Sequence, residues 1–82
     1  MFDNISDNRH YGVNDGCYGY VKNRIKNGVM VELDNGEVAI SWRFGNLFPG
    51  TKVLCNVIKL GDGLKKPIIE IESVLEDKLY AA

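Results

Sequence analysis

Five short segments of alternating apolar and polar residues, separated by turn residues, crowd into residues 16–74 of this chain. Alternation with a period of two is typical of strands that bury one face. The segments start at Gly16, Asn27, Asp34, Gly50 and Pro67. Five short strands in about sixty residues suit a small closed barrel, so the chain is predicted to be all-β. Such barrels commonly bind ligands on an outer face.

The chain has 82 residues, which leaves room for one domain with one modest core. Apolar residues make up 45% and charged residues 26%, a composition that argues against wholesale disorder. No apolar run approaches the roughly 20 residues that span a bilayer, and the N-terminus lacks a signal pattern. We expect a cytoplasmic protein with no membrane partner, consisting of an arm at 1–15, a barrel at 16–74 and a tail at 75–82.

The first two strands have a clear inward face. Strand one is expected at 16–25, with its odd positions inward and its even positions outward, and the turn at Asn27 and Gly28 leads to strand two. The predicted inward residues are Cys17, Gly19, Val21, Ile25, Val29, Val31 and Leu33. Met30 and Glu32 are predicted to face outward.

Strand three is expected at 37–42, after a tight turn at 34–36. We assign Val38 and Ile40 to the interior, with Ala39, Ser41 and Arg43 outside. Trp42 is assigned to packing at the barrel end, and exposed stacking is the alternative.

The rest of the chain completes the barrel. Residues 43–51 are too few for a full helix, and Leu47 and Phe48 are expected to close one barrel end. Strand four is predicted at 52–60 and strand five from Pro67 onward. Their predicted inward residues are Val53, Cys55, Val57, Ile69 and Ile71, with Glu70 and Glu72 outside. The arm is expected to be flexible and to settle near Tyr11 and Val13, and the sequence allows a short helix from Val74 onward.

Charge is unevenly distributed along the chain, although the net charge is only −1. Residues 17–66 hold eight Lys or Arg and four Asp or Glu, a net of +4. The flanking residues 1–16 and 67–82 carry −2 and −3. A basic middle between acidic ends permits nucleic-acid binding without requiring it.

No residue pattern points to catalysis or to a cofactor. Cys17 and Cys55 form no CxxC pair, and we expect buried free thiols. A zinc site needs about four ligands, which one His and two distant Cys do not supply. His10 lies in a polar segment and is expected at the surface. We therefore predict no enzymatic activity, no metal, no cofactor and no small-molecule substrate.

The side chains that are predicted to face outward from strands one to three form a candidate nucleic-acid site. Rings that stack on bases, together with cations that neutralise phosphates, are what single strands require. The candidate residues are Tyr18, Tyr20, Lys22, Arg24, Lys26, Met30, Arg43 and Phe44. Further phosphate contacts are open to Lys52, Lys59, Lys65 and Lys66. The alternative is ordinary: Tyr is favoured in strands, and Lys and Arg solvate an outer face.

Four segments resemble the S-one RNA-binding domain, the OB-fold unit repeated in the largest small-subunit ribosomal protein. They are Gly19–Lys22, Gly28–Val31, Gly36–Ser41 and Pro49–Val57. The stretch Val31–Val38 is also similar to bacterial translation initiation factor one, another single OB domain. The resemblance implies a five-stranded OB-fold Greek-key barrel, a link to translation, and single-stranded RNA or DNA as partner.

Three positions depart from the S-one pattern. Asn27, Met30 and Ala39 stand where that family usually carries two aromatic residues and a His. Stacking is worth about 1–3 kcal/mol per base, so their absence weakens the functional inference. The predicted function is a small non-enzymatic module that binds single-stranded nucleic acid with modest affinity and little sequence preference. The alternative is a protein-interaction module that kept the barrel and lost nucleic-acid binding.

Overall fold

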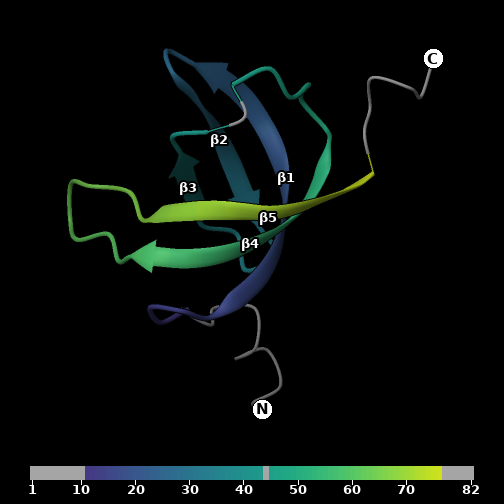
Figure 1. Cartoon of the computed structure of the whole chain (residues 1–82). Helices are drawn as coiled ribbons and strands as arrows, with labels where there is room; N and C mark the ends of the chain where they lie inside the picture. The colour runs from purple at the N-terminus through teal and green to yellow at the C-terminus, as the bar shows by residue number, and fades with distance from the viewer. Residues whose placement is uncertain (1–10, 44, 77–82) are drawn as a thin grey trace.

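The computed structural model describes residues 11–43 and 45–76, and their regular structure is entirely β-strand. The strands are β1 (Gly16–Ile25), β2 (Gly28–Leu33), β3 (Val38–Ser41), β4 (Lys52–Lys59) and β5 (Ile68–Glu76). They form a closed barrel in the order β1-β2-β3-β5-β4, and β4 pairs back onto β1 (Figure 1). Only β3 and β5 run parallel. This five-stranded Greek-key barrel is of the OB type, which confirms the predicted fold class.

Alternate residues of four strands fill the barrel, as their spacing predicts. The buried side chains from these strands are Cys17, Val21, Val29, Val31, Leu33, Val53, Cys55, Val57, Ile69 and Ile71. Cys17 lies directly opposite Cys55 in the β1–β4 ladder, and both are free thiols, as expected. Leu47 also reaches the core from the loop between β3 and β4.

The prediction for β3 was wrong by one residue. Ala39 and Ser41 are buried, whereas Val38 and Ile40 are half-buried on the outer side. Trp42 is 56% exposed and does not pack in the barrel end. The small side chains of this strand, and not the branched ones, therefore face the interior.

The loop before β3 explains this register. The Leu33 N–H donates to the Glu37 carbonyl at 2.7 Å, so the turn between them holds the three residues 34–36. An odd loop length places odd residues opposite odd residues, and Ala39 lies opposite the buried Val31. Directly opposite residues share a face. Ala39 must therefore point inward, whatever its hydrophobicity.

Some segments outside the first four strands are placed differently from what the sequence predicted. Tyr11 packs against the core and its hydroxyl donates to the Asp34 carboxylate, but Val13 is exposed. Phe48 is 40% exposed and does not plug the barrel beside Leu47. Residues 74–76 continue β5 where a helix was allowed for. The remainder of the predicted arm and of the predicted helix, at 1–10 and 77–82, lies outside the described residues.

Two features are absent from the part of the chain that the structure describes. In residues 11–43 and 45–76 there is no helix long and apolar enough to cross a membrane. The same residues hold no group of three or more His, Cys, Asp or Glu side chains placed to bind a metal ion.

Candidate nucleic-acid interface

Two tyrosine rings and one lysine form a compact platform on the outer face of β1 and β4. Tyr18 and Tyr20 are 50% and 48% exposed, at alternate positions of β1. Lys52 lies opposite Tyr20 in the β1–β4 ladder. Its Nζ is 5.8 Å from the Tyr18 ring centroid and 6.0 Å from that of Tyr20. These distances suit cation–π contact, so the three side chains present two rings and a cation together. We call this group the tyrosine platform.

A bulge separates the tyrosine platform from the basic residues that follow it on β1. Val21 lies opposite Val31, but Asn23 lies opposite Met30, so Lys22 is the extra residue. Lys22 remains exposed. Because of this extra residue, Tyr20 and Arg24, which lie on either side of the bulge, do not point to the same face of β1.

Arg24 consequently leaves the predicted patch. It lies opposite the buried Val29 at the end of the barrel, and its guanidinium carbon is 4.9 Å from the centroid of the Phe48 ring. Lys26 is exposed in the turn between β1 and β2. The predicted row of outward cations is therefore divided between the β1 face and the barrel end.

Beside β1, the outer face of β2 is apolar and acidic. Met30 is half-buried, and the Asn23 amide nitrogen lies 3.7 Å from its sulfur. Glu32 is exposed directly opposite Tyr20. Tyr20 thus has an anion on its β2 side and Lys52 on its β4 side. Phosphates are favoured on the β4 side, because like charges repel.

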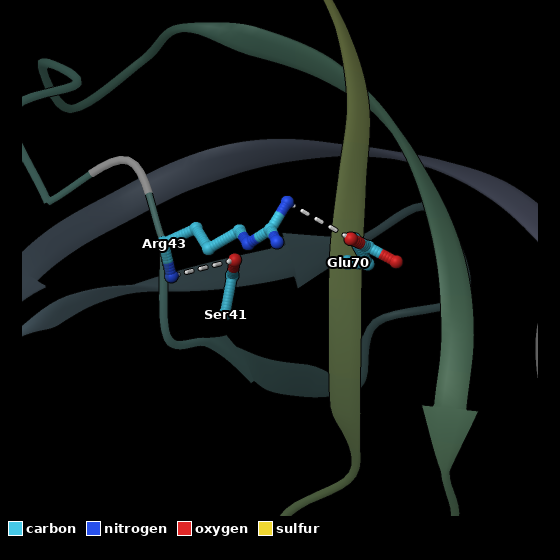
Figure 2. Close-up of polar contacts among 3 residues, drawn as sticks. All are labelled: Ser41, Arg43 and Glu70. Carbon is cyan, nitrogen blue, oxygen red and sulfur yellow. Dashed lines mark hydrogen bonds and ion pairs between the residues drawn. The ribbon is translucent and has the colours of Figure 1, made fainter.

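Arg43 lies apart from the tyrosine platform. Its Nη1 is 3.1 Å from Glu70 Oε2, and its backbone N–H donates to Ser41 Oγ at 3.4 Å. Figure 2 shows the side chain reaching from the segment after β3 across to β5. In the structure the Glu70 carboxylate balances this charge, and Arg43 faces β5 and not the two tyrosines. Phe44, its predicted neighbour in the site, lies outside the described residues.

The corrected register of β3 adds an aromatic residue to the outer surface. Trp42 directly follows the inward Ser41 and is largely exposed, which fits the stacking alternative. Trp42 was predicted to pack at the barrel end because Val38 and Ile40 were expected to face the interior. The odd length of the loop at 34–36 was the signal that could have placed Trp42 outside.

A basic groove lies at the base of the loop between β4 and β5. Its volume is about 430 Å³, and it lies between the outer side of β3 and this loop. The lining residues are Ile40, Lys59, Leu60, Asp62, Leu64, Lys65, Lys66 and Ile68. The loop extends beyond the barrel (Figure 1). Loops at this place in OB folds take part in oligonucleotide binding, and three lysines here outnumber one aspartate.

The thiol pair in the core carries no comparable signal. A hydrogen bond with Cys17 and burial raise the pKa of the Cys55 thiol. A thiol with a raised pKa stays protonated, and the protonated form is a weak nucleophile. Cys55 therefore acts as a small apolar side chain in the barrel core, whereas the same hydrogen bond lowers the pKa of the buried Cys17 thiol.

Fold and surface together define an OB-type barrel with an aromatic and basic outer face. Comparisons of the chain with protein-family models, with curated proteins and with solved structures found no match.

Proposed function

We propose that this protein is a non-enzymatic module that binds single-stranded RNA or DNA. The observation that carries the proposal is the tyrosine platform, in which Lys52 lies over the half-exposed rings of Tyr18 and Tyr20. Bases stack on such rings whatever their sequence, and a cation close to the rings neutralises the adjoining phosphate. Affinity is accordingly modest and sequence preference low.

The distribution of charge indicates how a strand lies on the barrel. Glu32 repels phosphates from the β2 side of Tyr20, so the backbone runs past Lys52 and Lys22 while the bases lie on the rings. The groove at the β4–β5 loop offers Lys59, Lys65 and Lys66 as a second group of cations. A role related to translation, in a cytoplasmic setting, accords with the S-one resemblance.

Replacing the rings tests the stacking model directly. Tyr18→Ala and Tyr20→Ala are each expected to weaken binding of a fluorescent single-stranded oligonucleotide about tenfold, because stacking contributes about 1–3 kcal/mol per base. Fluorescence anisotropy at low salt measures the affinity.

The matched controls are Tyr18→Phe and Tyr20→Phe, which keep each ring and remove only its hydroxyl. They are expected to bind within about twofold of the unaltered protein, since the stacking surface is unchanged. Equal binding by the Ala and Phe variants would remove the basis of the stacking model.

A further inference from the structure

The strand β5 pairs with β4 along one side, but along its other side it pairs with β3 over very little of its length. It pairs with β4 from Ile68 to Glu76, but with β3 only at Ile68, opposite Ile40, among the described residues. Because β3 ends at Ser41, no described strand continues along that side of β5. Among the described residues, β5 beyond Ile68 therefore has a ladder partner on its β4 side alone, and its other side presents a strand edge. Unpaired backbone groups on such an edge are a template for another strand.

Next to the single β3–β5 pair, the contact between the segment after β3 and β5 is made by a side chain and not by a strand ladder. Arg43 crosses from the segment after β3 to Glu70 on β5 (Figure 2). The Arg43 side chain is 70% exposed and that of Glu70 38% exposed. Ion pairs this exposed contribute little to stability and are readily exchanged. Arg43 thus shows where a cation can bind beside the β5 edge, and its side chain does not pair with the backbone groups of that edge as a strand would.

The chemistry of the edge specifies its occupant. Glu70 and the exposed Glu72 both lie on β5, and Glu72 is the extra residue of a bulge between Ile71 and Ser73 in the β4–β5 ladder. Basic side chains on an added strand would face carboxylates, whereas acidic ones would be repelled. A second copy of β5 brings the same glutamates to the edge, which disfavours self-pairing.

We propose that the free edge of β5 binds an extended peptide segment of a partner protein that carries Lys or Arg. The peptide adds a strand beside β5, and one of its cations takes the place of Arg43 on Glu70. This mode of recognition draws affinity from main-chain hydrogen bonds and specificity from alternate side chains. The surface is distinct from the tyrosine platform, so the proposal stands independently of nucleic-acid binding.

A synthetic eight-residue peptide of alternating Val and Lys tests the proposal. Titrated into the full isotope-labelled chain, it is expected to shift the backbone amides of residues 70–76 and to slow their hydrogen exchange. The same peptide with N-methyl groups on alternate residues keeps its charge and loses main-chain donors, so it is expected to leave these amides unchanged. Equal effects of both peptides, or no shifts at 70–76, would overturn the proposal.

Two substitutions with the same change in net charge test the role of Arg43. Arg43→Gln releases Glu70 and is expected to strengthen peptide binding about threefold, since a competing surface ion pair is worth a few tenths to 1 kcal/mol. Lys26→Gln, in the turn between β1 and β2, is expected to leave the affinity unchanged. Glu70→Gln is expected to weaken binding. Equal strengthening by the Arg43 and Lys26 variants would reduce the effect to net charge and overturn the proposal.

Discussion

At the residue scale, the close approach of β1 and β2 depends on one small residue. A Cβ at Gly19 would lie 2.6 Å from Val31 Cγ1 and 2.9 Å from the Glu32 carbonyl oxygen. Neither neighbour can move freely, because Val31 is fully buried and Glu32 belongs to the β1–β2 ladder. At Gly16, on the same strand, the nearest atom would be 3.8 Å away.

These two glycines give a matched pair of stability predictions. Gly19→Ala is expected to lower the free energy of unfolding by about 1–3 kcal/mol, the usual cost of overpacking. Gly16→Ala is expected to change it by no more than about 0.5 kcal/mol. Urea titrations followed by tryptophan fluorescence measure both. Equal midpoints for the two variants would show that the close approach at Gly19 is not a constraint.

Residue-scale properties of the site could be predicted only where alternation holds. The exposure of Tyr18, Tyr20 and Lys22 follows from the period of two and was confirmed. Arg24 was misplaced, because nothing local announces a bulge at Lys22. The ion pair of Arg43 could not be predicted, because its partner, Glu70, lies on a strand distant in sequence.

At the element scale, turn length decides which face of β3 is buried. Alternation in residues 38–41 fits either face, because Val and Ile favour strands on both sides of a sheet. The three-residue loop at 34–36 selects the face that carries Ala39 and Ser41. Hydrophobicity suggested the opposite face, whereas the ladder places Ala39 and Ser41 opposite the buried Val31 and Val29. In the other four strands the buried positions follow the predicted parity up to the bulge at Lys22 in β1 and the first bulge of β5, and Ile25, which was assigned to the interior, is only half-buried.

Substitutions at neighbouring positions test the register of β3. Ala39→Val adds two methyl groups to a filled interior and is expected to lower the free energy of unfolding by about 1–3 kcal/mol. Val38→Thr, on the half-buried outer side, is expected to cost no more than about 1 kcal/mol. Thermal and urea unfolding measure the difference. A larger loss for Val38→Thr than for Ala39→Val would favour the opposite register.

At the scale of the whole molecule, opposite charges lie on different parts of one barrel. Lys22 and Lys52 accompany the tyrosine platform, and further lysines line the groove at the β4–β5 loop. Glu70 and Glu72 accompany the free edge of β5. Under the proposed function, this separation would let a chain of net charge −1 attract a polyanion. The overall fold was predictable from the strand pattern, but the separation was not, since it depends on which strands become neighbours.

The most direct test of the central claim is a titration of the isotope-labelled chain with a short mixed-sequence single-stranded RNA at low salt, followed by backbone amide shifts. The proposed function predicts shifts centred on Tyr18, Tyr20 and Lys52 that salt reverses, because phosphate neutralisation releases counterions. An absence of shifts at high RNA concentration would contradict the proposal that this barrel binds single-stranded nucleic acid. Shifts that salt does not weaken would contradict the part assigned to the lysines.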